Sequence, residues 1–185
     1  METYLLRVHQ GQVKHLCEAA LEAREQIYVG LATGKQPLVW IGLHNLVDAT
    51  ANISKEFWGD WKTKTIEARR PLRESLGVED TSPFRNRSLR NHLEHFDERL
   101  DAWYHSSKRR NYADFLIGPP NTIVGIERSD IFRHFDPQSG YVYFGDESYN
   151  IGELAKAVDS LFAVVAGEAV KPHWDPHRPR SGNEV

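Results

Sequence analysis

The chain has a single cysteine, Cys17, and no apolar run that approaches the roughly 20 residues needed to cross a bilayer. A lone cysteine excludes a disulfide within the chain. The first residues also lack the basic stretch and the following apolar stretch of a secretory signal. These features suit a reducing compartment. We therefore expect a cytoplasmic protein with no membrane association, in which Cys17 belongs to the apolar core.

Motifs of several enzyme classes are missing as well. The sequence has no Walker loop, no Gly-x-Gly-x-x-Gly, no Gly-x-Ser-x-Gly and no His-Glu-x-x-His. The net charge is only −3, so a general excess of positive charge does not favour nucleic-acid binding. We predict neither a cofactor nor a bound metal.

Apolar residues recur at helical spacing over most of the chain. With 185 residues and an apolar content of 40%, the sequence can form one domain with a substantial core. Recurrence at three and four residues predicts helices over 11–32, 38–57, 61–76, 83–107 and 151–168. Asp60 is expected to cap the third of these helices, and Pro71 to kink or restart it. Asn150 and Glu153 form a predicted capping pair before the last helix.

The region between the fourth and fifth predicted helices has a different pattern. A turn signal at 136–140 and alternating residues at 141–144 predict a β-hairpin region over about 122–145. Within it, strands are expected at 122–128, 131–135 and 141–144. The expected fold is mainly α, an up-and-down helical bundle of four to five helices with a β-hairpin inserted before the last helix. We expect a single domain over 1–170 and a disordered tail over 171–185.

The second predicted helix carries a polar stripe. Asn45, Asp48 and Asn52 fall at i, i+3 and i+7, in a segment that is otherwise without formal charge. Buried polar groups need hydrogen-bond partners. The stripe therefore forms either an internal hydrogen-bond network or the polar wall of a site. In the second interpretation, Asn45 and Asp48 contact the substrate.

One short segment carries the residues best suited to phosphate chemistry. Arginine binds phosphate oxygens bidentately, and histidine exchanges a proton near neutral pH. Two arginine–histidine pairs overlap there, Arg87 with His92 and Arg90 with His95. On a helix that advances about 100° per residue, Arg90 and His95 border one polar face that contains Asn91. His92 leans toward the core, so geometry favours the second pair and makes His92 a structural histidine.

The run Arg90-Asn91 followed by His95 resembles the Arg-x4–6-His motif of HEPN domains, a superfamily of small helical bundles that includes many ribonucleases. The resemblance implies a homodimer whose cleft is lined by the motif and, in catalytic members, metal-independent cleavage of RNA. Carried over to this chain, it makes His95 the general acid or base on a ribose 2′-hydroxyl or on the leaving oxygen. Arg90 would stabilise charge developing on phosphorus, and Asn91 would orient one of them.

The resemblance covers the motif and its helical context. Toxin-type members often carry a tyrosine two residues after the histidine, where this chain has Asp97. From the motif and its helical context we predict a metal-independent endoribonuclease in which Arg90 and His95 act across a dimer cleft. Arg87 is predicted to lie beside them and to bind substrate.

Other interpretations stay open. The motif could belong to a non-catalytic dimeric HEPN-like module that binds RNA, a nucleotide or a protein, or to an ordinary solvated helix face. His44, Asp48 and His95 could together hold one metal ion. Trp58 and Trp61 could stack on bases, although tryptophan more often fills a core.

Overall fold

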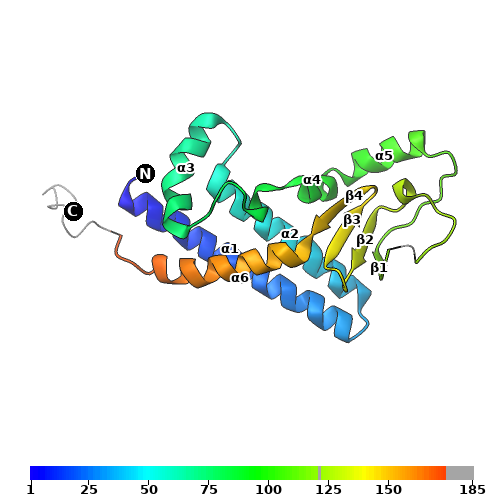
Figure 1. Ribbon diagram of the computed structural model, residues 1–185, viewed down its shortest axis with the longest axis horizontal. Helices are drawn as coiled ribbons and strands as arrows, with labels where there is room; N and C mark the ends of the chain where they lie inside the picture. Colours follow the sequence, from blue (N-terminus) through cyan, green and yellow to red (C-terminus); the bar gives the residue numbers. More distant parts are fainter. Residues whose placement is uncertain (121, 174–185) are drawn as a thin grey trace, which may run out of the picture.

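The computed structural model describes residues 1–120 and 122–173, and it is mainly helical, as predicted (Figure 1). Within these residues the α-helices are α1 (Thr3–Ala32), α2 (Gln36–Trp58), α3 (Thr63–Leu76), α4 (Ser88–Glu94), α5 (Phe96–Ser106) and α6 (Ile151–Glu168). The strands are β1 (Leu116–Ile117), β2 (Arg133–Asp136), β3 (Tyr141–Phe144) and β4 (Glu147–Asn150), and the short 3-10 turns are η1 (Pro83–Arg85) and η2 (Arg128–Asp130). The predicted tail lies outside the described residues from 174 onward.

The two longest helices, α1 and α2, pack against each other as an antiparallel pair, and α6 lies along α1 (Figure 1). Apolar side chains fill the space between them, and the most deeply buried include Val13, Cys17, Ile53, Val158 and Val165. Cys17 thus belongs to the core, as predicted. Burial raises the pKa of its thiol to about 12, so the thiol is protonated and a poor nucleophile at neutral pH.

Gly42 sets how closely α1 and α2 approach. A Cβ at this position would lie 2.7 Å from the Ala23 carbonyl oxygen and 2.9 Å from the Ile27 backbone nitrogen. Gly42→Ala is therefore expected to push the helices apart and to lower the free energy of unfolding by about 1–3 kcal/mol. Gly11→Ala is the matched control, because a Cβ there meets nothing within 4 Å, and better helix propensity should raise stability by about 0.5–1 kcal/mol. Urea unfolding followed by circular dichroism measures both, and equal stabilisation by the two substitutions would contradict the close helix contact.

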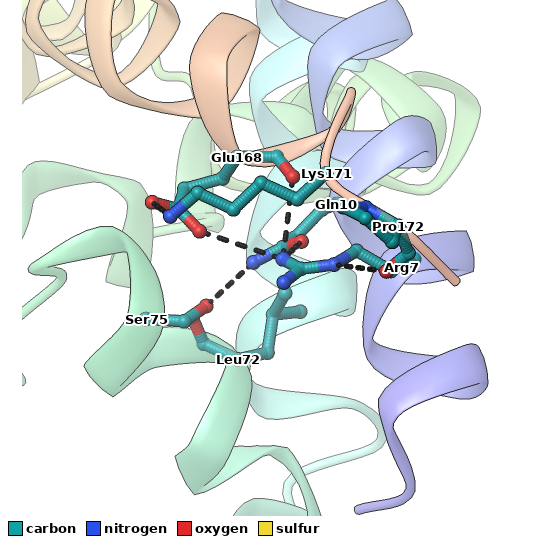
Figure 2. Close-up of polar contacts among 7 residues, drawn as sticks. All are labelled: Arg7, Gln10, Leu72, Ser75, Glu168, Lys171 and Pro172. Atoms are coloured by element: carbon teal, nitrogen blue, oxygen red, sulfur yellow. Dashed lines mark hydrogen bonds and ion pairs between the residues drawn. The ribbon is translucent and has the colours of Figure 1, made fainter. Parts of the chain in front are cut away.

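A polar cluster (Figure 2) holds the end of the bundle that lies away from the sheet (Figure 1). Gln10 of α1 is fully buried, and its Nε2 donates to Ser75 Oγ of α3 at 3.0 Å. Arg7, one turn earlier, donates to the Gln10 side-chain oxygen at 2.6 Å and to the Glu168 carbonyl oxygen of α6 at 3.2 Å. Because a buried amide needs such partners, the cluster fixes the ends of α1, α3 and α6 relative to one another.

The sheet leads directly into α6. Its strand order is β1-β2-β3-β4, with β1 parallel to β2 and the other neighbours antiparallel. Asp136 closes the predicted turn after β2 by accepting the Gln138 backbone N–H at 3.0 Å. Asn150 Oδ1 accepts the Glu153 backbone N–H at 2.9 Å, which confirms the predicted cap of α6. The hairpin is confirmed as β2 and β3, but residues 122–128 contain no strand. The second neighbour of β2, on the side away from β3, is β1.

The predicted single helix over 83–107 is wrong, because the structure divides it into η1, α4 and α5. The first break follows a side-chain turn, in which Asn86 Oδ1 accepts the backbone N–H two residues later at 2.9 Å, so that α4 starts anew. The second break is at His95, where φ −102° and ψ 38° leave the helical region. Beyond it, the Phe96 ring packs on Phe132 with the ring centroids 5.3 Å apart, which holds α5 against the sheet.

The predicted cap of α3 is corrected, and the alternative in which Pro71 restarts the helix does not hold. The helix begins after Lys62 and is not capped by Asp60, which instead accepts the Lys62 backbone N–H at 3.3 Å ahead of the helix. Pro71 lies inside α3, and the helix neither stops nor restarts there. Arg73, two residues later, is buried and donates to the Phe57 carbonyl oxygen at 2.6 Å. This contact joins α3 to the last turn of α2, shortly after the proline, whose nitrogen cannot donate a helical hydrogen bond.

Candidate functional site

Arg90 of α4 lies where three surface hollows meet, and its side chain is 25% exposed. Two of the hollows, each of about 260 Å³, form what we call the α4 groove, between α4 and α2. The groove is lined by Lys55, Trp61, Arg85, Asn86, Arg87, Ser88 and Asn91 at one end and by His44, Asp48, Leu93 and Glu94 at the other, with Arg90 shared between them. The third hollow, of about 240 Å³, extends from Arg87 and Arg90 toward β4 and the start of α6.

One end of the α4 groove is basic. The Arg87 guanidinium carbon lies 4.7 Å from the centroid of the Trp61 ring, and that of Arg85 lies 5.7 Å from it. Arg85 also pairs with Asp80 at 3.5 Å. Within residues 1–120 and 122–173, Arg87 has no carboxylate within 4.0 Å. Burial, and then the positive charge of Arg90, lower the pKa of Arg87. Among the described residues, Lys55 and three arginines line this hollow and no carboxylate does, so this end of the groove has an excess of positive charge.

The other end of the groove contains carboxylates. Arg90 pairs with Glu94 one turn later, and its Nε lies 3.9 Å from Asp48 Oδ1. His44 faces the same hollow, and its Nε2 is buried with no hydrogen-bond partner in the described part of the chain. Burial, and then the positive charge of Arg133, lower the pKa of His44, so this imidazole is neutral at pH 7. Arg90 therefore lies between a basic and an acidic end.

The other two residues of the preferred motif, Asn91 and His95, lie at different places along α4 and its junction with α5. Asn91 lines the basic end of the groove beside Arg90. His95 occupies the break between α4 and α5, and its side chain is 49% exposed. Its Nδ1 lies 3.3 Å from Glu98 Oε1. His95 does not line the three hollows around Arg90, so within one copy of the chain the groove brings together Arg90 and Asn91 but not His95.

His92, the histidine of the other overlapping pair, faces the sheet. Its ring stacks on Phe144 with the centroids 4.7 Å apart, and its Nε2 lies 3.0 Å from Glu147 Oε1. The side chain is only 14% exposed. His92 is thus a packing residue between α4 and the hairpin, as its position on the helix predicts. Arg87, its partner in that pair, belongs to the groove.

The polar stripe on α2 does not act as one unit. Asp48 lines the groove beside Arg90. Asn45 is exposed and donates to Gln26 Oε1 of α1 at 3.1 Å, away from Asp48. Asn52 is exposed as well. Of the two α2 residues predicted to contact substrate, only Asp48 lies at the site, and the three residues form neither a common network nor a common wall.

Sequence reasoning missed Lys55 and Arg85 as members of the groove. Arg85 stands two residues before Arg87, and the density of arginine from 85 to 90 is the signal that could have identified it. Lys55 has no such signal, because it reaches the site only through the packing of α2 on α4. Of the two tryptophans considered for base stacking, Trp58 is fully buried, whereas Trp61 is 38% exposed and lines the groove.

Two further properties of the described residues bear on the site. No helix among them is long and apolar enough to cross a membrane. No three histidine, cysteine or acidic side chains in residues 1–120 and 122–173 lie close enough to hold a metal ion together, so the alternative site of His44, Asp48 and His95 is not formed.

Comparison of the chain with models of protein families, with curated proteins and with solved structures finds no match.

Proposed function

We propose that the protein binds RNA in the α4 groove and cleaves it without a metal ion, through the HEPN-like pair Arg90 and His95. The observation that carries this proposal is the environment of Arg87, which lies next to Arg90 and has no carboxylate partner in the described residues. Two neighbouring guanidiniums repel each other, and a phosphate between them would offset that repulsion and accept their N–H groups. Lys55 and Arg85 line the same hollow and bring the number of cationic side chains there to four.

The proposed chemistry needs only groups that the protein and RNA already carry. His95 removes the proton from a ribose 2′-hydroxyl, and the 2′-oxygen forms a bond to the adjacent phosphorus. The bond from phosphorus to the 5′-oxygen of the next nucleotide breaks, and that oxygen takes up a proton from solvent water, while His95 afterwards releases its proton to the solvent. Arg90 stabilises the negative charge on the phosphoryl oxygens during this exchange. The products are a 2′,3′-cyclic phosphate and a 5′-hydroxyl.

The position of His95 favours a site built from two copies of the chain. His95 lies outside the hollows that surround its own Arg90 and is half exposed. A twofold pairing of two α4 helices would place His95 of one copy against Arg90 of the other. The proposed active form is therefore a homodimer, as the resemblance to HEPN domains implies.

The test is cleavage of an end-labelled pool of structured RNAs by purified protein in EDTA. We expect fragments that end in a 2′,3′-cyclic phosphate, identified by mass spectrometry. DNA strands of the same sequences should bind but stay intact, because they lack the 2′-hydroxyl. Intact RNA after incubation with micromolar protein, or cleavage that appears only after a divalent metal is added, would contradict the proposal.

A second candidate function is RNA binding without cleavage. Arg90 already pairs with Glu94, and His95 lies beside Glu98, so both groups of the motif have partners in the absence of substrate. The same experiment separates the two candidates. A non-catalytic module would retain labelled RNA in a filter-binding assay at low salt, yet leave it uncut.

A further inference from the structure

Trp61 has an unusual backbone for its residue type. Its φ is +66°, in the left-handed region that bulky side chains rarely adopt. The indole stacks nearly parallel to that of Trp58, with an interplanar angle of 12° and the centroids 6.0 Å apart. Trp58 is fully buried, and its Nε1 donates to Asp80 Oδ1 at 3.0 Å. Strained backbone persists where the surrounding structure holds it, and such positions cluster at binding sites.

Arginine completes a stack that begins in the core. Trp58 is its buried base, Trp61 follows at 38% exposure, and the Arg87 guanidinium lies over the Trp61 ring at 4.7 Å. We call these three residues the Trp61 stack. A guanidinium on an aromatic face is attracted by the π system, and its N–H groups remain free to bind an anion. The exposed end of the stack therefore offers planar π surface and positive charge together.

We infer that the Trp61 stack binds an unpaired nucleobase, so that the α4 groove selects single-stranded over double-stranded RNA; this rests on the proposed function. Bases of a single strand can turn outward and stack on aromatic rings or on arginine planes, whereas the base faces in a duplex are covered by their neighbours. The cations beside the stack, Lys55 and Arg90, then lie where the flanking phosphates would pass.

The experiment measures binding apart from cleavage. The probe is a fluorescein-labelled 2′-O-methyl RNA of about twelve nucleotides, a length typical of single-strand sites, which cannot react through its 2′-oxygen. Anisotropy titrations compare this strand with the same strand annealed to its complement. We expect the wild-type protein to bind the single strand at least about tenfold more tightly. Trp61→Gly should weaken single-strand binding about tenfold and change duplex binding less than twofold.

The choice of variants separates a lost base contact from a damaged fold. Glycine suits the positive φ at this position, so Trp61→Gly relieves backbone strain while it removes the ring. Trp61→Phe keeps an aromatic face and should recover most of the single-strand affinity. Arg87→Lys keeps the charge but loses the plane, and should weaken only the single strand. Tyr28→Ala removes an exposed aromatic ring of α1 and should change neither titration.

Each outcome bears on a different claim. If Trp61→Gly lowers the affinity for both probes by the same factor, or leaves both affinities unchanged, the inferred base contact is wrong while RNA binding stands. If Trp61→Phe is as weak as Trp61→Gly, the ring does not act through stacking and the inference fails. If the wild-type protein binds neither probe, the proposed function is wrong and the inference falls with it.

Discussion

His95→Ala is expected to lower the rate of RNA cleavage by about 10²–10⁴-fold, the usual contribution of a general acid or base. Arg90→Ala is expected to lower it by about 10²–10³-fold, the usual contribution of one group that stabilises a developing charge. The His95 side chain is half exposed and its nearest partner is Glu98, so its removal should leave stability and RNA affinity nearly unchanged. Single-turnover cleavage of a labelled RNA in EDTA measures both rates.

Matched substitutions elsewhere in the chain test whether the loss is specific. His15 of α1 is 77% exposed and lies 4.0 Å from Glu18, an i, i+3 arrangement like that of His95 and Glu98. Arg24 is 23% exposed and pairs with Asp159, so it resembles Arg90 in burial and pairing. His15→Ala and Arg24→Ala should both cleave at the wild-type rate. Wild-type cleavage by His95→Ala would remove this histidine from the chemistry.

Mixing the two inactive variants tests whether the site is shared between copies. In an equimolar mixture about half of the dimers are mixed, and each mixed dimer restores one of its two sites if Arg90 and His95 come from different copies. About a quarter of the wild-type activity should therefore return, on the counting of a twofold dimer. If none returns, Arg90 and His95 of the same copy act together, and the shared site is wrong.

The fold could be predicted where its determinants are local. The last helix was predicted at its true bounds because its cap is encoded in four consecutive residues, and Asn150 accepts the Glu153 backbone N–H as the pattern requires. The break at His95 could not be predicted, because it accompanies the packing of Phe96 on Phe132, which directly precedes β2 and lies 36 residues away in sequence. An uninterrupted apolar period through 83–107 gave no sign of it.

The same distinction holds for the site. Arg87, Arg90 and Asn91 stand close together in sequence, and the structure places all three in one groove. The contribution of Lys55 depends on the packing of α2 against α4. Arg87 has no carboxylate partner among the described residues, and this depends on which side chains the fold places around it. A sequence pattern can identify the charges of a site, but the balance between them is set by tertiary structure.

The second large effect is expected at a buried ion pair that supports the sheet. Asp114→Ala should lower the free energy of unfolding by about 3–5 kcal/mol, because it leaves a buried guanidinium without its partner. The side chains of Asp114 and Arg133 are only 5% and 11% exposed. Arg133 donates to Asp114 Oδ1 through its Nε at 2.9 Å and through its backbone N–H at 3.0 Å. A second guanidinium nitrogen pairs with Asp114 Oδ2. Tyr112 donates to the same carboxylate at 2.7 Å. Urea unfolding at pH 7 measures the loss.

A pH series tests whether the charge of Asp114 is responsible. Burial alone would raise the pKa of Asp114, but hydrogen bonds from Arg133 and Tyr112 outweigh it and hold the pKa below its ordinary value. The unfolded carboxyl has a pKa of about 3.9. The ion pair should therefore stabilise the fold fully above that pH and lose its contribution as pH falls through the lower folded pKa. Asp114→Asn, which keeps the shape without the charge, should be less stable than the wild-type protein at pH 7, and the difference in unfolding free energy should shrink as the carboxyl is protonated.

The matched control is Asp159→Ala, which removes a carboxylate that is 51% exposed and should lower the free energy of unfolding by less than about 1 kcal/mol. A loss as small for Asp114→Ala would mean that the pair does not hold the sheet.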